Sequence, residues 1–165
     1  MLTNARLAFQ DHDHVRSINA AIKQAQQKCA DANVSLNSTR EAILRLLWHS
    51  NRPLGAYQLQ QQLAKVADKP IAPPTIYRAL EFLQDLGLVH KIPSLNAFIG
   101  CPFPNSEHSN IFLICEKCNI VAEVSDRKTN QLLQEICQKA NFKLNSQIIE
   151  LFGICPNCEE KNKQK

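Results

Sequence analysis

The sequence predicts an α+β protein of two small domains, and three observations carry this prediction. Apolar residues recur at steps of three and four over residues 17–86, which is typical of amphipathic helices. After residue 110 the apolar period shifts toward two, which favours strands. Two Cys-x-x-Cys pairs lie in this second half. A chain of 165 residues has room for one or two domains of this size.

The first domain is predicted to begin with two helices. Residues 1–16 show no sustained period and are expected to form a flexible tail. A helix follows over 17–33, since Asn33 can take the left-handed conformation that ends helices. Ser38-Thr39-Arg40-Glu41 matches a capping box and predicts the start of the second helix. Its buried stripe is expected to be Ile43, Leu46 and Leu47.

Two more helices and a hairpin complete this domain. The third helix is predicted over 56–67, with Leu59, Leu63 and Val66 inward. Pro70, Pro73 and Pro74 delay the fourth helix to Thr75, and it should run to Leu86 before Gly87. Residues 88–92 and 97–101 are predicted to form a β-hairpin. Helices followed by a hairpin are the order of a winged helix-turn-helix domain, expected over 17–101.

A linker and a second, α+β domain follow. Proline, asparagine and serine residues over 102–109 predict the linker, and residues 161–165 are expected to form a tail. The domain at 110–160 is predicted to hold strands at 111–114, 120–124 and 144–152 and a helix over 126–140. The helix is expected to bury Leu132, Leu133, Ile136 and Ala140.

Composition and charge narrow the class of protein. Four Gly, eight Pro and 44% hydrophobic residues exclude collagen-like and low-complexity chains. The apolar runs stop short of the roughly 18 residues that a membrane helix needs, and no apolar signal segment opens the chain, so a cytoplasmic protein with no membrane partner is expected. Residues 1–92 carry 11 Lys/Arg against 7 Asp/Glu, and residues 93–165 carry 8 against 8. An excess confined to the first half indicates a polyanionic partner.

The two Cys-x-x-Cys pairs predict a structural zinc. Each pair can turn both sulfurs inward, and two such knuckles complete a closed tetrahedral thiolate site. The ligands would be Cys115, Cys118, Cys155 and Cys158. A redox pair at Cys155 and Cys158 is the alternative, which the absence of a preceding βαβ pattern weakens.

A second set of zinc-type donors surrounds the hairpin and the linker. The set is His90, Cys101, His108 and Glu123. Thiolate and carboxylate together would neutralise Zn²⁺. Spacing alone leaves open whether the four converge, and surface or core histidines are common. Cys29 and Cys137 lie in helical patterns and are expected to be buried thiols, while His12 and His14 fall in the predicted tail.

The chain resembles the ferric uptake regulator family. The resemblance rests on the run Pro74-Thr75-Ile76-Tyr77-Arg78-Ala79-Leu80, on Gly87-Leu88-Val89-His90-Lys91 and on both Cys-x-x-Cys motifs, and it spans roughly residues 18–160. It implies a homodimer that binds palindromic double-stranded DNA, with strands 111–114 and 144–152 as candidate pairing surfaces. No small-molecule substrate other than the metal ion is implied.

Within that family the chain is most similar to the zinc uptake regulators. His90 precedes the hairpin turn, Cys101 follows it, and a single Glu107-His108 stands where iron sensors carry a histidine-rich run. The resemblance implies a zinc-responsive transcriptional repressor of zinc uptake genes with two Zn²⁺ per chain. The regulatory ligands would be His90, Cys101, His108 and Glu123, and the four paired cysteines would be structural. An iron, manganese or peroxide sensor is the alternative, which a thiolate in the sensing set disfavours.

Candidate DNA contacts gather at the starts of two predicted helices. A guanidinium early in the fourth helix can bond a guanine edge with two hydrogen bonds, so Arg78 is the candidate for base readout, with a phosphate contact as the alternative. The remaining candidates are Tyr57, Thr75 and Tyr77, where relatives touch DNA, and Arg40 and Lys91 for phosphates.

A zinc enzyme is a further alternative function for the protein, but no His-x-Glu or His-Glu-x-x-His motif supplies a general base. A thiol redox switch stays open as well.

Overall fold

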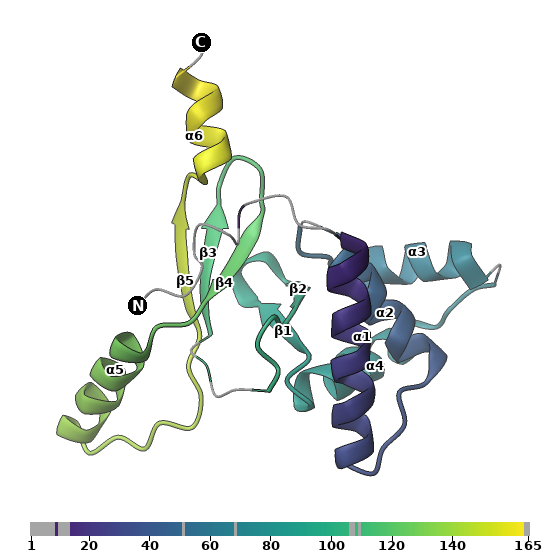
Figure 1. Cartoon of the computed structure of the whole chain (residues 1–165), viewed down its shortest axis with the longest axis horizontal. Helices are drawn as coiled ribbons and strands as arrows, with labels where there is room; N and C mark the ends of the chain where they lie inside the picture. The colour runs from purple at the N-terminus through teal and green to yellow at the C-terminus, as the bar shows by residue number, and fades with distance from the viewer. Residues whose placement is uncertain are drawn as a thin grey trace. The chain divides into compact units, whose positions relative to one another are not determined.

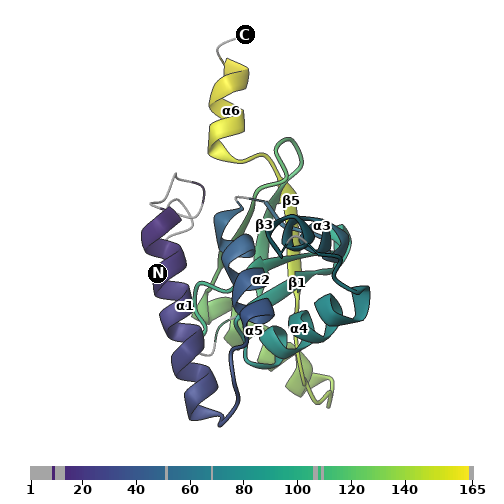
Figure 2. The same cartoon turned by 90° about the vertical axis from the view of Figure 1, so that its right-hand side faces the viewer.

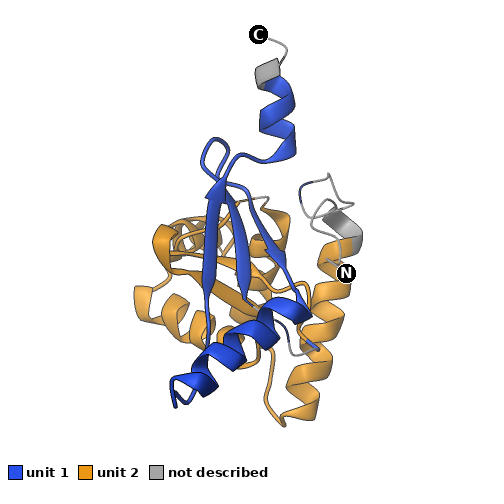
Figure 3. Cartoon of the chain, turned by 90° about the vertical axis from the view of Figure 1, so that its left-hand side faces the viewer, with its two compact units in different colours: residues 1–10, 105–165 blue, residues 11–104 orange. Residues whose placement is uncertain are grey.

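The computed structural model describes residues 9, 14–50, 52–67, 69–105, 108 and 110–163. They form two compact units, residues 11–104 and residues 105–165 together with 1–10 (Figure 3). The division at 104 and 105 falls within the predicted linker, of which residues 106, 107 and 109 lie outside the described part. Most of the predicted tail, including His12, also lies outside it.

The unit of residues 11–104 begins with four helices (Figure 1). They are α1 (His14–Asp31), α2 (Ser38–His49), α3 (Ala56–Ala67) and α4 (Pro73–Asp85). Each turns an apolar stripe to a shared core, whose side chains include Ile22, Ala25, Ile43, Leu44, Leu59, Ile76, Leu80 and Leu83. Figure 2 views this bundle from a second side, with α1 again seen from its side. Burial of these stripes, rather than helix propensity, holds such short helices.

A two-stranded antiparallel hairpin completes this unit. Strand β1 (Val89–Ile92) pairs with β2 (Ala97–Gly100), and the 3₁₀ turn η2 (Pro93–Leu95) joins them. Asn96 closes the turn with a positive φ of 44°. Leu54, just before α3, forms a bridge to Phe98 and ties the hairpin to the helices. The order of helices and hairpin is that of a winged helix.

Several helix boundaries differ from the sequence prediction. α1 begins at His14, three residues before the predicted start. The N-cap of α2 is Asn37, whose side chain accepts a hydrogen bond from the backbone amide of Arg40. The capping box predicted to start at Ser38 is therefore one residue late. α4 begins at Pro73 rather than Thr75, because a proline in the first turn loses no helical hydrogen bond. Val66, predicted inward, is 81% exposed in the last turn of α3.

The unit of residues 105–165 is built on a three-stranded sheet in the order β4-β3-β5. β3 (Ile111–Cys115) is central, pairs antiparallel with β4 (Val121–Val124) and pairs parallel with β5 (Ile149–Gly153). The parallel pair requires a crossover, which α5 (Arg127–Lys139) provides. β5 is shorter than the strand predicted over 144–152. It covers only the C-terminal part of that range and ends one residue beyond it. α6 (Pro156–Lys163) was not predicted, and it extends into the predicted tail.

The apolar stripe of α5 is exposed, contrary to the prediction that it is buried. Leu132 and Ile136 are 57% and 54% exposed, Ala140 is exposed, Leu133 is half-buried, and no residue of the helix is buried. The amphipathic pattern is present, but nothing in the described part of the chain covers it. Cys137, on the same helix, is half-buried rather than buried, whereas Cys29 is only 3% exposed.

Neighbouring apolar side chains are exposed in the same way. They are Phe142, just after α5, and Ile148, Leu151, Phe152 and Ile154, in and beside β5. Exposed apolar side chains in such number are typical of interaction surfaces. Among the described helices, none combines the length and the apolar character needed to cross a bilayer.

Candidate metal centre and nucleic-acid interface

The parallel pairing of β3 and β5 brings the two Cys-x-x-Cys pairs together. Cys115 is the last residue of β3 and lies opposite Gly153, the last residue of β5. The turn after β3 carries Cys118, and the chain after β5 carries Cys155 and then α6. Because parallel strands end at the same edge of a sheet, knuckles that are 36 residues apart in sequence become neighbours.

The four sulfurs form a cluster of the size that zinc requires. Cys115, Cys118, Cys155 and Cys158 have ligand atoms within 4.8 Å of one another, and Sγ of Cys118 lies 3.7 Å from Sγ of Cys155. The two sulfurs of a disulfide are only about 2.05 Å apart. Tetrahedral sulfurs bound to zinc at about 2.3 Å stand about 3.8 Å apart. The donors therefore fit a closed four-thiolate zinc site and do not fit a disulfide between these two residues.

Backbone amides prepare one of these thiols for metal binding. Burial raises the pKa of Cys115, but hydrogen bonds from the backbone of Cys155, Cys118 and Lys117 together outweigh it and lower the pKa to about 6. The amide of Cys155 donates to Sγ of Cys115 at 3.3 Å. Burial raises the pKa of Cys118. A hydrogen bond with Cys155, then burial, raises that of Cys158 to about 12. Crowded thiols of this kind do not all ionise without a cation, and a metal supplies that charge.

A second donor pair lies in the same unit. Nε2 of His108 is 2.9 Å from Oε1 of Glu123, and the side chain of Glu123 is 1% exposed. Glu123 lies on β4 opposite Phe112 of the central strand. A carboxylate so deeply buried has exchanged water for protein partners, which is costly unless a cation or hydrogen bonds compensate it. An imidazole beside a buried carboxylate is also a common pairing at zinc sites.

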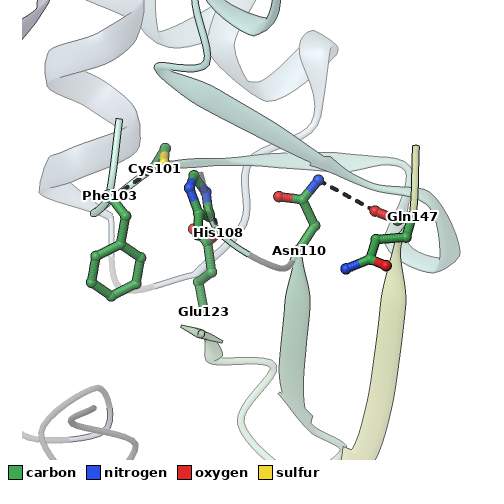
Figure 4. Close-up of polar contacts among 6 residues, drawn as sticks. All are labelled: Cys101, Phe103, His108, Asn110, Glu123 and Gln147. Carbon is green, nitrogen blue, oxygen red and sulfur yellow. Dashed lines mark hydrogen bonds and ion pairs between the residues drawn. The ribbon is translucent and has the colours of Figure 1, made fainter. Parts of the chain in front are cut away.

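A third donor pair lies on the hairpin of the other unit. His90 is on β1 opposite Ile99, and Cys101 directly follows β2 and is 1% exposed. A ring nitrogen of His90 and Sγ of Cys101 lie within 4.8 Å of each other. The amide of Phe103 donates to Sγ of Cys101 at 3.3 Å, as the close-up draws (Figure 4). Sequence reasoning missed this amide, because a backbone donor leaves no signal in the residue type.

The predicted DNA contacts present their side chains to solvent. Thr75, Tyr77 and Arg78 lie in the first turns of α4 and are exposed, while Ile76 and Ala79 on the other face are buried. Tyr57 opens α3 and is 69% exposed, and Lys91 on β1 is exposed. The first turn of α4 offers few backbone amides to an anion, because Pro73 and Pro74 have none and the amide of Thr75 donates to the carbonyl of Ala72 at 3.0 Å, so contacts to DNA would have to come from side chains. Exposed groups of this chemistry on a helix start suit a nucleic-acid surface.

Arg40 is already engaged within its own unit. Its Nη1 donates to the carbonyl of Ser35 at 2.6 Å, and its guanidinium carbon lies 3.4 Å from the centroid of the Phe82 ring. The side chain is half-buried. Stacking on an aromatic face leaves the outer N–H groups of a guanidinium available, so Arg40 joins α2 to α4 and can still donate outward.

Residues 31–152 match the model of the Ferric uptake regulator family. The chain belongs to this family. Over 84% of its length it is 34% identical to the zinc uptake regulation protein of Escherichia coli K12, covering 81% of that protein. A zinc uptake regulator complexed with zinc and DNA superposes with a TM-score of 0.82 at 30% identity, over 93% of this chain and 99% of that one.

A second solved relative, XcZur, is 34% identical and has been captured in two forms. Its holo form superposes with a TM-score of 0.78 over 86% of this chain and 99% of that one. Its apo form gives 0.51 over 87% and 99%. Because identity and coverage hardly change between the two comparisons, the holo and apo forms of XcZur differ from each other in arrangement.

Proposed function

We propose that this member of the ferric uptake regulator family is a zinc-responsive, DNA-binding transcriptional repressor that controls zinc uptake genes. The observation that carries the proposal is the pair of preformed donor sets outside the cysteine cluster, His108 with Glu123 and His90 with Cys101. The similarity to zinc uptake regulators supports it. In this role the protein is not an enzyme, and we assign no catalytic step to any residue.

The cysteine cluster would hold a structural zinc. Four thiolates close the coordination sphere and leave no position for a substrate or an exchanging ligand. The sheet edge is small and carries few buried side chains beyond β3 and β4. The metal would therefore supply much of the free energy that keeps β3, β5 and α6 together.

The regulatory zinc would take His90, Cys101, His108 and Glu123 as ligands. One thiolate and one carboxylate neutralise the charge of Zn²⁺, and two neutral imidazoles complete a tetrahedral set. A thiolate favours zinc over Fe²⁺ and Mn²⁺, which suit nitrogen and oxygen donors. Each donor pair is already assembled within its own unit. A metal bound to both pairs would thereby link the winged helix to the second domain.

This linkage suggests how the metal controls DNA binding. In a two-fold dimer, the angle between the domains sets the separation of the two α4 helices, which must match half-sites one or more helical turns apart. Shifting a population from mostly incompetent to mostly competent requires about 5 kcal/mol of differential affinity, which a three- or four-ligand zinc site can supply. The change in arrangement between holo and apo XcZur supports a mechanism of this class.

The homodimer would form through the apolar surface of the second domain. Leu132 and Ile136 on α5 and Leu151 and Phe152 on β5 are about half exposed. β5 is an edge strand, since the sheet order is β4-β3-β5. An unpaired edge flanked by apolar side chains is a surface that a second copy can complete.

The recognition surface would be the exposed face at the start of α4. Arg78 would read a guanine, with Thr75 and Tyr77 beside it. Tyr57 at the start of α3 and Lys91 on the hairpin would contact the backbone. Arg40 would donate its outer N–H groups to a phosphate while it stays stacked on Phe82.

A gel-shift titration with buffered free Zn²⁺ against a palindromic operator library tests this function. We expect sequence-specific binding that requires Zn²⁺ and is supported less well by Fe²⁺ or Mn²⁺. Equal support by Fe²⁺ or Mn²⁺ would favour the iron or manganese sensor. Binding that is the same with and without metal would overturn the proposal.

A further inference from the structure

We propose that Trp48 is a positioning residue for the sensing thiolate, and that it acts by pressing its indole ring against Gly100, the residue next to Cys101. The inference rests on the proposed function, because it assigns Cys101 to the regulatory zinc. It adds a residue that donates nothing to the metal. Every contact it uses lies within the unit of residues 11–104.

The contact between Trp48 and Gly100 is tighter than any side chain would allow. A Cβ added at Gly100 would lie 2.7 Å from Cε2 and 2.8 Å from Cδ1 of the Trp48 ring, and closer still to its Nε1. Gly87 is the glycine whose positive φ suits it to its turn, at 64°, and Gly100 does not share that conformation. The backbone at Gly100 therefore does not demand glycine, and the space taken by the indole does.

The ring is held from the side of the helices. Trp48 lies in the last turn of α2 and is half-buried against the core formed by the helices. Its neighbour Leu47 is 4% exposed, which fixes this turn of the helix in the core. An indole fixed in this way is a rigid wall rather than a movable cover, because close-packed interiors resist displacement.

The strand that leads to the thiol is also held by β1. Gly100 pairs with Val89 in the hairpin, and the amide of Cys101 donates to the carbonyl of Leu88 at 2.9 Å. The end of β2 is thus held by hydrogen bonds to β1 and by the close contact of Gly100 with the indole. Together with the Phe103 amide, these contacts leave Sγ of Cys101 little freedom to move.

This arrangement sets how well the thiol meets a metal. Groups that orient a ligand without touching the metal change metal affinity by about 10- to 100-fold when they are removed. α2 also packs on α4, and Arg40 of α2 stacks on Phe82 of α4. Trp48 therefore connects the strand end beside Cys101 to α2, the helix that packs on the recognition helix α4.

A double-mutant cycle on the full-length protein tests the proposal. The variants are Gly100→Ala, Trp48→Leu and both together, and the readout is the affinity for the second Zn²⁺, measured by competition with a chromophoric chelator on protein that holds its structural zinc. We expect Gly100→Ala to weaken this affinity by about tenfold or more when Trp48 is present. In the Trp48→Leu background the added methyl group has space, so the same change should cost less than about threefold.

The matched control is Gly55→Ala, in the same unit. A Cβ there would meet Oε1 of Gln58 at 3.6 Å, an ordinary contact, so zinc affinity should stay unchanged. Equal losses from Gly100→Ala in both backgrounds, or no loss in either, would overturn the proposal. If the wild-type protein bound no second zinc at all, the proposed function itself would fail, which is a distinguishable result.

A second measurement covers the case in which Gly100→Ala fails to fold. Trp48 is the single tryptophan of the chain, so tryptophan emission reports the surroundings of this ring, which include its contact with Gly100. Titrating Zn²⁺ into wild-type protein that holds its structural zinc should shift or quench this emission and saturate at one further equivalent. Emission that stays constant while the second zinc binds would contradict a ring pressed against the ligand strand.

Discussion

Nε2 of His108 lies 2.9 Å from Oε1 of Glu123, and the carboxylate that it meets is almost completely buried. The pair forms without any contribution from the winged-helix unit. Half of the proposed regulatory site is therefore in place within residues 105–165 before a metal binds. This relationship makes Glu123 the most direct residue at which to test the site.

Glu123→Gln should weaken binding of the regulatory zinc by about tenfold or more, because an amide keeps the shape of the carboxylate but lacks its charge. Competition titration with a chelator measures the change. Glu150→Gln is the control, since Glu150 on β5 also lies opposite Phe112 but is outside the donor group. Equal losses in the two variants would remove Glu123 from the ligand set.

Metal analysis should find two zinc ions per chain that differ in lability. The four-thiolate zinc is closed and should exchange slowly, whereas the regulatory zinc should leave to a mild chelator. Inductively coupled plasma analysis before and after chelation counts both, and alkylation should label the paired cysteines only when the structural zinc is also removed. A single inert zinc would leave the sensing role without a site.

Cys101→Ser should abolish zinc-dependent operator binding while the fold, the dimer and the structural zinc are retained. A hydroxyl is a poor zinc ligand compared with a thiolate, so the regulatory zinc would lose its anchor on the hairpin. Gel shifts with buffered Zn²⁺ measure the effect, and circular dichroism checks the fold. Cys137→Ser is the matched control, since this thiol lies on α5 outside both donor groups. Unchanged operator affinity in the Cys101 variant would exclude this thiol from the mechanism.

The number of protons released when zinc enters the cysteine cluster should depend on pH in a defined window. The pKa of Cys115 in the folded, metal-free protein is lowered to about 6 from an ordinary value of 9.0. This thiol is therefore largely ionised at pH 7 and becomes protonated at pH 5. The pKa values of Cys118 and Cys158 are raised, so both thiols keep their protons between pH 5 and pH 7.

Zinc binding should therefore release nearly one more proton per zinc at pH 5 than at pH 7, because at pH 5 the metal must also displace the proton of Cys115. Calorimetry in buffers of different ionisation enthalpy measures it, and Cys115→Ser should remove the step. The sign for stability follows from the same shift. The lowered pKa of Cys115 stabilises the metal-free fold above pH 9, and this contribution is lost as the pH falls through about 6. A release that does not change with pH would contradict a preformed thiolate.

Arg78→Ala should cost about 1 to 3 kcal/mol of discrimination at one operator position, while non-specific binding persists. Binding selections on a randomised operator measure the preference. Arg45→Ala is the charge-matched control, because Arg45 pairs with Glu41 of its own helix at 2.7 Å. Retained preference in the Arg78 variant would place base readout on another residue.

Local patterns predicted most of the secondary structure and failed at its ends. The helices over residues 38–49 and 56–67 and the hairpin agree with the sequence to within a residue or two, because the buried stripe and the turn residues act locally. The cap of α2 was misplaced, since Asn37 and Ser38 are both good caps and only the backbone decides between them. The short helix α6 has almost no apolar stripe, so its sequence gives no periodic signal from which a helix could be predicted.

The residue types and spacings alone determined the donor chemistry: two Cys-x-x-Cys knuckles, and a thiol, two imidazoles and a carboxylate around a hairpin and a linker. Tertiary structure decided which of these donors meet. Cys115 and Cys155 are close because β5 pairs parallel to β3, and a strand partner so distant in sequence leaves no local signal. It also decided that Leu132 and Ile136 face solvent, because an amphipathic pattern specifies an apolar face but not what covers it.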